Sequence, residues 1–545
     1  MKRNEFSFAN FQILPSVQNK ADVAIGQGFY LHILIKSNQP IPKGIQVTLE
    51  QCVGLTVESF TQSSPTPKNQ NTIHVVAYVV VDSSRAVTEG DKVSYTVNVS
   101  GYYKKSFYYI ASSVNEGDIR VQINKAFCYT PERDESLDKI KDNFISYSAK
   151  LFNATGQPMQ NTPIQIYSVI GDGIKDKVTI TNDPESGQLL QAVEPVIMDN
   201  NVFIPVSSNS DGEIKFRVYP KKDISAEIEL GVELSGLNVN FIVPSIYIIS
   251  HKPSNPNKLL PRPIIVDLND GRLSAYGSNQ TFEVKIPHYN NALDGDSVLF
   301  FIKDDNDVFV PPAKKIKEPY SSGYSFFLYY DIFPINKPSE LYYVISPEEG
   351  YSLYSEPQNV TYTGGGDNRP SDKIQRVLDK PIVYSSWANP KSRPPLNEDS
   401  DSDVLSETYY VNSMDIEGYT RNGGYGLFIK LVGTSDITDQ QKPKFGDKIH
   451  FTMYLNGGLY VSEQIPEKDV QRVKRVSSVI NHVPDHHGGN TSTTMIYIEH
   501  ASLANLSHSS NGGSAMIYFE YYVVSDEGER VYSNYWQSKI ETIGD

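Results

Sequence analysis

Cysteine is nearly absent from this sequence, which holds only Cys52 and Cys128 among its 545 residues. Two thiols this far apart do not make the disulfide framework of a small secreted domain. We expect each to be a buried or half-buried thiol in a different domain. A disulfide across the first domain junction is the alternative that the spacing leaves open. Folding is therefore not expected to depend on an oxidising compartment.

Long apolar runs are also missing. No stretch approaches the ~18 apolar residues that a membrane-spanning helix needs, so we expect no insertion into a membrane. Residues 1–12 carry two cations but no continuous apolar segment and no small-residue cleavage site, which argues against a standard signal peptide. We expect synthesis in the cytoplasm, with non-classical release to the extracellular surface as one route. The sequence does not fix the final location.

Basic residues are too few for a nucleic-acid partner. The chain has 49 Lys and Arg against 64 Asp and Glu, a formal net charge of −15. A field of this sign repels phosphate backbones and keeps the protein soluble. We therefore predict no nucleic-acid partner.

The motifs of common enzymes do not occur. There is no His-Glu-x-x-His, no Gly-x-Ser-x-Gly, no P-loop and no Cys-x-x-Cys, so no zinc protease, serine hydrolase, nucleotide-binding ATPase or redox dithiol is indicated. A glycosidase pair cannot be recognised from sequence, because its two carboxylates can be distant in the chain. We predict that the protein is not an enzyme, and we assign no catalytic residue, no cofactor and no metal ligand.

Residues that favour β-strands are abundant instead. Tyr (36) and Phe (23) far outnumber Met (7), a composition that suits half-buried, pleated surfaces. Apolar and polar residues alternate in 29–35, 72–79 and 93–99, as they do in the strands of sandwiches. Only two segments resemble helices, 137–145 and 467–480. The second contains β-branched residues that favour a strand, so its structure stays open.

The chain is too long for one hydrophobic core. Polar, Pro- and Gly-rich stretches at 252–258 and 363–370 are typical of linkers, and a softer boundary follows the strand expected at 107–110. We predict an all-β fold of tandem immunoglobulin-like β-sandwich domains, the last one larger and carrying insertions. The predicted domains are 1–117, 118–254, 255–365 and 366–545.

Internal repeats support related domains. A Gly-Asp pair precedes an alternating strand at 90–95, 295–300 and 446–451, and turn residues at corresponding places indicate related modules. Residues 341–355 also resemble residues 521–533, and each segment predicts a terminal hairpin with an acidic, Gly-closed turn.

Two turn-and-strand patterns occur in the second domain. Residues 148–166 contain a strand, a Gly-x-Pro turn and a second strand, and residues 209–218 contain an Asp-Gly turn followed by an alternating strand. With these patterns the domain resembles the bacterial immunoglobulin-like repeats of the intimin and invasin class. In the third domain, residues 286–298 are similar to a repeat of large bacterial surface proteins. The resemblance implies an adhesive or spacer role at a surface.

Histidine is concentrated in the last domain, at His450, His482, His486, His487, His500 and His508. The loop 481–489 places three of these imidazoles beside the carboxylate of Asp485, a set that suits zinc, copper or nickel. A Gly- and Pro-rich loop is a poor preformed cage, so we favour solvated histidines over a metal or pH-responsive site.

Acidic loops are the second candidate for metal binding. The segment Glu398–Asp403 places oxygen ligands at alternate positions, as calcium loops do, but lacks the mid-loop glycine and final glutamate of an EF-hand. The turn at 303–307 is weaker, because turns favour Asp and Asn for backbone reasons. We favour solvated loops in both cases.

Aromatic clusters lie at 323–330 and 518–522. They suit either recognition on an outer sheet face or cross-strand ladders that steady a sandwich, and we favour the ladders. Trp387 and Trp536 both lie in the last domain, and we expect each of them in the core.

These features predict a non-enzymatic, modular bacterial protein that acts in adhesion and binds a protein or glycan on a cell surface. The last domain, 366–545, is the expected recognition head. The alternative is a leaderless protein that assembles with copies of itself into filaments or inclusions, or joins a toxin complex. The ligand, the export route and the oligomeric state do not follow from the sequence. Nor does it tell whether the chain is a piece of a longer protein.

Overall fold

A computed structural model describes residues 11–543, apart from short gaps. The gaps are 43, 66–69, 85, 101, 115–116, 134–135, 170–173, 185–188, 199–200, 252, 254–257, 278, 304–306, 318–322, 348–350, 389–402, 421–422, 437, 461–467, 487–488, 510–511 and 526–528. The chain divides into two compact units, Met1–His251 and Lys252–Asp545. Nearly all regular structure is β-strand, which confirms the all-β class.

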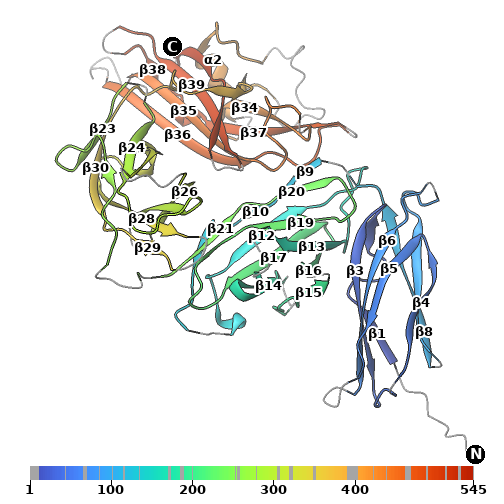
Figure 1. Ribbon diagram of the computed structural model, residues 1–545. Coiled ribbons are helices and arrows are strands. Elements are labelled where there is room, and N and C mark those ends of the chain that lie inside the picture. Colours follow the sequence, from blue (N-terminus) through green and yellow to red (C-terminus); the bar gives the residue numbers. More distant parts are fainter. Residues whose placement is uncertain are drawn as a thin grey trace, which may run out of the picture. The chain divides into compact units, whose positions relative to one another are not determined.

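The first sandwich opens the first unit and consists of two facing four-stranded sheets (Figure 1). Their strand orders are β1-β3-β6-β5 and β2-β8-β7-β4. Lettered along the chain, with β1 and β2 as two halves of strand A, these orders become A-B-E-D and A′-G-F-C, which is the immunoglobulin-like arrangement. The strands are β1 (Phe11–Pro15), β2 (Asp22–Ala24), β3 (Gly28–Ser37), β4 (Val47–Val53), β5 (Leu55–Gln62), β6 (Thr72–Val81), β7 (Lys92–Val99) and β8 (Tyr103–Ser112).

Side-chain alternation places the core of this sandwich between its sheets. Every second residue of β3 from Phe29 to Ile35 is buried, and the residues between them are only partly buried. The buried side chains join one cluster that includes Tyr95 and Tyr109, whose hydroxyls hydrogen-bond at 2.9 Å. The strands predicted at 29–35, 72–79 and 93–99 are therefore confirmed.

The second sandwich completes the first unit. Its sheet β10-β12-β17-β14 faces a sheet of order β15-β16-β13-β19. The strands β18 and β19 follow one another as two parts of one strand, and β20 and β21 do the same. The sheet that contains β19 therefore extends to β21, which pairs antiparallel with β18. Beyond this strand, β11 pairs in parallel with β21, and β9 pairs in parallel with β20. The elements are β9 (Gly117–Arg120), β10 (Gln122–Ile123), β11 (Phe127–Tyr129), η1 (Leu137–Lys139), β12 (Ile145–Lys150), β13 (Pro163–Ser168), α1 (Ile174–Lys177), β14 (Val178–Asn182), β15 (Val196–Met198), β16 (Asn201–Ser207), β17 (Glu213–Pro220), β18 (Ala226–Ile228), β19 (Leu230–Glu233), β20 (Val239–Ile242) and β21 (Ile246–Ile249).

Hydrogen bonds join the first two sandwiches within their unit. The backbone N–H of Asp22 donates to the carbonyl of Gln160 at 2.8 Å, and the N–H of Gln160 donates to the Asp22 carboxylate at 2.7 Å. The buried amide of Gln27 donates to the carbonyl of Pro163 at 2.6 Å and accepts from the N–H of Ala24 at 3.0 Å. These contacts fix one sandwich against the other.

The third sandwich has the sheets β22-β24-β27 and β23-β30-β28-β25-β26, with β29 beside β28. In letters these are A-B-E and A′-G-F-C-C′, again immunoglobulin-like. Its elements are β22 (Ile264–Ile265), β23 (Arg272–Ala275), β24 (Thr281–Ile286), β25 (Ser297–Lys303), β26 (Val308–Lys315), β27 (Tyr324–Tyr329), η2 (Tyr330–Ile332), β28 (Pro338–Ser346), β29 (Leu353–Tyr354) and β30 (Gln358–Gly365).

The fourth sandwich repeats the order A-B-E as β32-β34-β37 and the order A′-G-F-C-C′ as β33-β41-β39-β35-β36, with longer central strands. The sheet β32-β34-β37 faces the sheet β31-β40-β39-β35-β36, to which β33, β38 and β41 are added. Its elements are β31 (Arg376–Leu378), β32 (Ile382–Ser385), β33 (Tyr410–Asn412), α2 (Ser413–Ile416), η3 (Glu417–Thr420), β34 (Tyr425–Thr434), β35 (Lys448–Leu459), β36 (Lys468–Val479), β37 (Thr491–Glu499), η4 (His500–Ser502), β38 (Leu506–Ser507), β39 (Met516–Val524), β40 (Arg530–Ser533) and β41 (Trp536–Glu541).

The two segments that resembled helices differ from that interpretation. Residues 137–139 form a single 3-10 turn, and residues 468–479 form the edge strand β36. In β36 the side chains of Val470, Arg472, Lys474 and Val476 are partly buried while those between them are exposed. Burial in β36 therefore alternates from one residue to the next, as in a strand, which is the structure that its β-branched residues favour.

The Gly-Asp pairs close the base of a hairpin in three sandwiches. The carboxylates of Asp91, Asp296 and Asp447 each accept the backbone N–H three residues earlier, at 2.8–3.0 Å. The hairpins are β7–β8, β25–β26 and β35–β36, so the first pair precedes strand F and the other two precede strand C. The motif therefore marks a hairpin base and not one fixed position in the sandwich.

The predicted terminal hairpins are present and match one another. The N–H of Tyr343 in β28 donates to the hydroxyl of Ser355 at 2.9 Å, and the N–H of Tyr521 in β39 donates to that of Ser533 at the same distance. Their turns, 348–350 and 526–528, lie outside the described residues. Four main hydrophobic clusters, one in each sandwich, accompany this order. The boundaries 1–117, 118–254, 255–365 and 366–545 stay a prediction.

Candidate functional site

The two cysteines lie in different cores, and both are free thiols. Burial raises the pKa of both, for Cys128 to about 12. A thiol that does not ionise is a poor nucleophile and a poor metal ligand. Neither cysteine is therefore a candidate for chemistry.

The histidine loop of the fourth sandwich is shaped by its carboxylate. Asp485 accepts hydrogen bonds from the N–H and the hydroxyl of Thr493 at 3.0 and 2.8 Å. The ring of His482 packs on the turn at Gly446, where a Cβ would come within 2.5 Å of Cε1. His486 is exposed, and His487 lies outside the described residues. In the described part of the chain, no three His, Cys, Asp or Glu side chains gather as a metal site would require.

His450 has a different environment. Its ring stacks on Tyr522 with centroids 4.7 Å apart and planes 8° apart. Burial, together with the charges of Lys448 and Arg530, lowers the pKa of His450 to about 4. This imidazole is neutral at physiological pH and acts as a packed aromatic ring.

Most of the acidic loop Glu398–Asp403 lies outside the described residues, and only Asp403 is placed. Its carbonyl accepts the N–H of Ser385 at 2.8 Å, which adds residues 403–405 to the edge of β32. The turn at 303–307 is likewise described only at its ends, Lys303 and Asp307.

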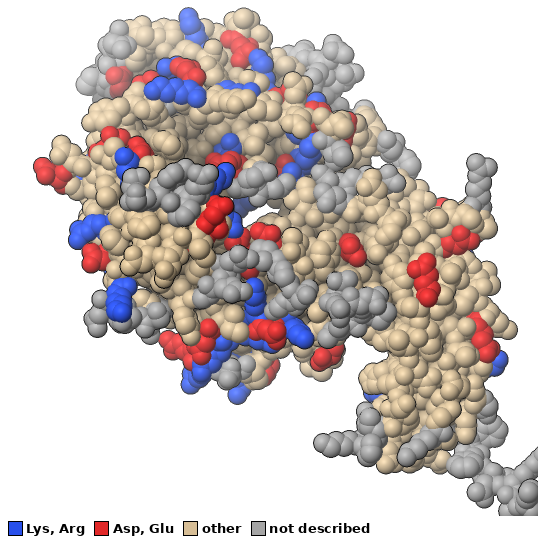
Figure 2. Space-filling view, viewed as in Figure 1, with Lys and Arg blue, Asp and Glu red and all other residues tan. Residues whose placement is uncertain are grey.

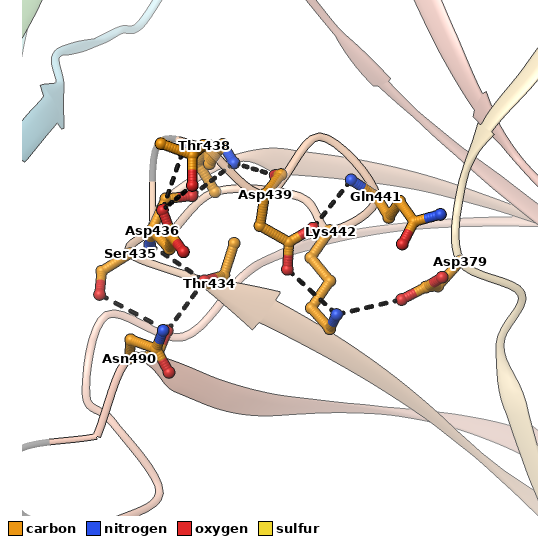
Figure 3. A network of polar contacts seen from close by, with 10 residues as sticks. Asp379, Thr434, Ser435, Asp436, Thr438, Asp439, Gln441, Lys442 and Asn490 are labelled. Atoms are coloured by element: carbon orange, nitrogen blue, oxygen red, sulfur yellow. Dashed lines mark hydrogen bonds and ion pairs between the residues drawn. The ribbon is translucent and has the colours of Figure 1, made fainter.

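The loop from β34 to β35 contains two lysines whose ammonium groups contact its own oxygen atoms, and Figure 3 shows the contacts of Lys442. The ammonium of Lys442 lies 3.1 Å from Asp439 and 3.3 Å from Asp379, and the hydrogen bond to Asp439 raises the pKa of Lys442. The ammonium of Lys444 donates to the carbonyls of Asp436, at 2.8 Å, and of Asp439. The oxygen atoms of this loop are thus neutralised or hydrogen-bonded by the ammonium groups of its own lysines.

A polar joint connects the third and fourth sandwiches within the second unit. Both terminal nitrogens of Arg530 lie 3.3 Å from the carboxylate oxygens of Asp331. The guanidinium lies over the rings of Tyr329, 3.4 Å from the centroid, and of Tyr522, at 4.5 Å. Burial is the largest single effect and lowers the pKa of Arg530, but the charge and hydrogen bond of Asp331 together with the nearby Tyr532 and Tyr522 outweigh it, so the pKa is raised. Charge pairing and cation–π contact thus hold the two sandwiches together at this joint.

A second ion pair is buried in the fourth sandwich. Arg376 in β31 meets Glu520 in β39 at 2.8 Å, and the side chains are 10% and 2% exposed. The other carboxylate oxygen of Glu520 accepts the hydroxyl of Tyr454 at 2.7 Å. The pair ties the first strand of the sandwich to the centre of its larger sheet, so its role is structural.

Aromatic side chains divide between these joints and the surface. Tyr329 and Tyr522, from the two predicted clusters, take part in the Arg530 joint, and Tyr522 also packs on Tyr532 of the neighbouring strand. Phe327 of the first cluster is 60% exposed. The clusters therefore supply both cross-strand contacts and an open aromatic surface.

The two tryptophans differ. Trp536 is buried in the core, as expected, whereas Trp387 is 44% exposed, so the prediction of a core position is wrong for Trp387. The indole N–H of Trp387 donates to the carbonyl of Met414 at 2.7 Å. The side chain of Met414 is itself 66% exposed. An indole whose only donor is satisfied internally presents an apolar ring to solvent.

The backbone around Trp387 is held in place by close contacts. The N–H of Ser386 donates to the carbonyl of Asp415 at 2.7 Å, and the N–H of Gly418 donates to the hydroxyl of Ser386 at 2.8 Å. A Cβ at Gly418 would lie 2.5 Å from the carbonyl oxygen of Ser386, so glycine is required there. Asn412 and Asp415 form a reciprocal capping box on α2. Trp387 and Met414 therefore form a preorganised surface patch, the Trp387 patch.

No catalytic constellation accompanies these features in the described residues. A hollow of about 380 Å³ in the second sandwich is lined mainly by apolar residues, among them Tyr167 and Phe241. Its one ionisable carboxyl, Glu233, has a pKa that burial raises, and no His, Lys or Cys lines the hollow beside it. Basic and acidic side chains mostly lie next to one another on the face shown in Figure 2.

No helix in the part of the chain that the structure describes is long and apolar enough to cross a membrane.

Comparisons with known proteins add little to this geometry. No known protein family and no curated protein matches the sequence. Among solved structures, the tetra-tandem repeat in the extending region of a large adhesion protein aligns over 98% of this chain and 99% of its own, with 8% identity and a TM-score of 0.15. The FN1–FN3 domains of chicken CNTN1 align over 79% and 99%, with 8% identity and a TM-score of 0.14. A Salmonella alpha-2-macroglobulin reacted with methylamine aligns over 99% of this chain and 40% of its own, with 8% identity and a TM-score of 0.15. TM-scores this low carry no argument, so the assignment of an immunoglobulin-like fold rests on the strand orders described above.

Proposed function

We propose that this protein is a non-enzymatic, modular adhesion protein whose fourth sandwich binds a protein or a glycan through the Trp387 patch. The exposed, internally hydrogen-bonded indole carries the proposal, since tryptophan is enriched among the residues that dominate binding energy. Its flat apolar face suits a sugar ring, an aromatic side chain or a cation. The resemblance of the second domain to intimin and invasin repeats supports a bacterial, surface-facing role.

The joints between neighbouring sandwiches support a presenting role for the other sandwiches. Within each unit, hydrogen bonds or ion pairs fix one sandwich against the next, at Gln27 in the first unit and at Arg530 in the second. A site on a rigid support loses little freedom when it binds. The four-domain division is part of this proposal.

Point substitution at Trp387 tests the proposal better than deletion of 366–545, which would strip Asp331 of its Arg530 partner. The full chain, fluorescently labelled, would be applied to a glycan array and to a panel of immobilised extracellular-matrix proteins. We expect Trp387→Ala to weaken binding to any positive spot by roughly 30-fold or more, as a hot-spot loss of about 2 kcal/mol implies. Trp387→Phe should retain a large part of the binding.

Tyr276 supplies the matched control. It is an aromatic residue of the third sandwich and is 71% exposed, so Tyr276→Ala removes a comparable ring outside the patch. Equal binding by the wild type and by Trp387→Ala would rule out the patch as the recognition site. Equal losses at both positions would indicate nonspecific aromatic stickiness instead.

A further inference from the structure

The third and fourth sandwiches share an outer sheet face in the same register. In the third, Ile264 of β22 pairs with Lys285 of β24, which pairs with Ser325 of β27. In the fourth, Ile382 of β32 pairs with Lys430 of β34, which pairs with Met495 of β37. Equivalent positions on the A-B-E sheet can therefore be compared one by one.

The fourth sandwich covers this face with its own chain. Tyr384 and Phe428 lie two residues from Ile382 and Lys430, on the same side of the sheet, and are 0% and 1% exposed. Residues of the long connection from β32 to β34, Ala388 and Val404, pack in the same cluster. The N–H of Leu405 also donates to the carbonyl of Val383 at 2.8 Å. On this sandwich the chain buries the face at Tyr384 and Phe428, although Tyr497, paired with Phe428, is 37% exposed.

The third sandwich leaves the same face open. Its connection from β22 to β24 is short, and Ile264, Val266 and Phe327 are 53%, 46% and 60% exposed. Val266 and Phe327 flank Glu283 on its two sides, since the N–H of Val266 donates to the carbonyl of Glu283 and Phe327 pairs with Glu283 in register. An apolar face that is covered in one repeat and bare in the next indicates that something else covers it.

The charges at the centre of the face indicate what that occupant is. Glu283 and Lys285 lie two residues apart on the same side of β24, with their charged groups 3.6 Å apart, and they are 30% and 50% exposed. A surface with one acid, one base and apolar flanks is complementary to itself under a two-fold axis. In such a pair, Glu283 of each copy meets Lys285 of the other, as isologous interfaces require.

We infer that the A-B-E face of the third sandwich is a self-association surface through which two copies of this chain form a two-fold dimer. The apolar residues Ile264, Val266 and Phe327 supply the buried area, and the paired charges set the register. This surface is separate from the Trp387 patch, and its test needs no partner molecule, so failure of one proposal does not affect the other.

Charge reversal in the full chain tests the dimer. Sedimentation velocity across the micromolar range should show wild-type protein passing from its 61.0 kDa monomer to twice that mass. Glu283→Lys and Lys285→Glu should each remain monomeric, because like charges then meet across the axis. The double variant should dimerise again. An equimolar mixture of the two single variants should form a mixed dimer, since one copy then carries two bases and the other two acids.

Two further variants separate the interface from general effects. Lys303→Glu/Glu340→Lys reverses a cross-strand pair on the other sheet of the same sandwich, where the ammonium and carboxylate are 2.8 Å apart, and should leave the dimer unchanged. Phe327→Ser should weaken dimerisation at least tenfold, and at concentrations where both proteins are monomers its melting temperature should equal that of wild type, because Phe327 is exposed. Monomers at every concentration, or dimers that survive the single reversals, would overturn the inference. Growth into open polymers would overturn it too, because a two-fold interface closes on itself.

Discussion

Substitution of Arg376 by methionine should destabilise the fourth sandwich strongly, because the partner of Arg376 is almost wholly buried. Glu520 is 2% exposed and lies 2.8 Å from the guanidinium. The same guanidinium donates to the carbonyls of Ser533 at 2.6 Å and of Ser371 at 3.2 Å. Arg376→Met leaves a buried carboxylate and two carbonyl oxygens without this donor.

The magnitude follows from the surroundings of the carboxylate. Removing one partner of a buried ion pair costs about 3–5 kcal/mol of unfolding free energy. The Tyr454 hydroxyl still donates to Glu520 in the variant, so we expect the lower end, about 3 kcal/mol. In Arg376→Met/Glu520→Gln no charge remains buried and the amide still accepts from Tyr454. The double variant should therefore be more stable than Arg376→Met alone.

Urea unfolding followed by tryptophan fluorescence measures this effect selectively, because Trp387 and Trp536 are the only tryptophans and both lie in the fourth sandwich. The matched control is Lys380→Met. Its ion pair with Glu407 is 2.6 Å long but 51% and 33% exposed, so we expect a loss below about 1 kcal/mol. The reasoning is refuted if Arg376→Met costs no more than Lys380→Met, or if the double variant is no more stable than Arg376→Met.

Two other predictions concern the pH response and the first joint. His450 has a pKa of about 4 when folded and about 6.5 when unfolded. The unfolded chain therefore binds more protons between these values, and stability falls as the pH drops from about 6.5 to about 4. Partial exposure limits the loss to about 1–2 kcal/mol. Urea melts should show that His450→Gln lacks this part of the pH dependence, and an unchanged pH slope would contradict the assignment. Gln27→Leu removes the hydrogen-bond partners of the Pro163 carbonyl and the Ala24 N–H. It should lower the unfolding free energy of the first unit by about 1–3 kcal/mol, measured in urea melts followed by circular dichroism. An unchanged urea midpoint would show that the joint does not depend on this amide.

Strands were predictable wherever one face of a segment is buried. The alternation in 29–35 and 72–79 reflects a sheet with one face in the core, and the Gly-Asp turns reflect a local hydrogen bond between residues three apart. The segment 467–480 could not be decided, because Val470, Val473, Val476 and Ile480 fit a helical face as well as a strand. Only the pairing of β36 with β35 resolves the ambiguity.

The candidate surfaces were not predictable in the same way. Arg376 and Glu520 are far apart in the chain, and no local pattern connects them before the strands are ordered. A core position is the expectation for Trp387 because tryptophan is usually buried, and the partner of its indole N–H, the carbonyl of Met414, lies 27 residues away in the sequence. The open face of the third sandwich becomes evident only by comparison with the fourth, where Tyr384 and Phe428 are buried at the positions equivalent to Val266 and Glu283.

In each sandwich, a strand near its start runs parallel to its last strand: β2 beside β8, β11 beside β21, β23 beside β30, and β33 beside β41. When tension is applied to the chain on both sides of a sandwich, these strands are pulled past each other lengthwise. The load then acts in shear on all the hydrogen bonds between them at once, whereas a hairpin pulled open at its end loses them one pair at a time. Rupture requires the whole row to break together, and its timing is governed by the unfolding rate and not by equilibrium stability. We therefore expect each sandwich to resist unfolding when the chain is pulled from both ends.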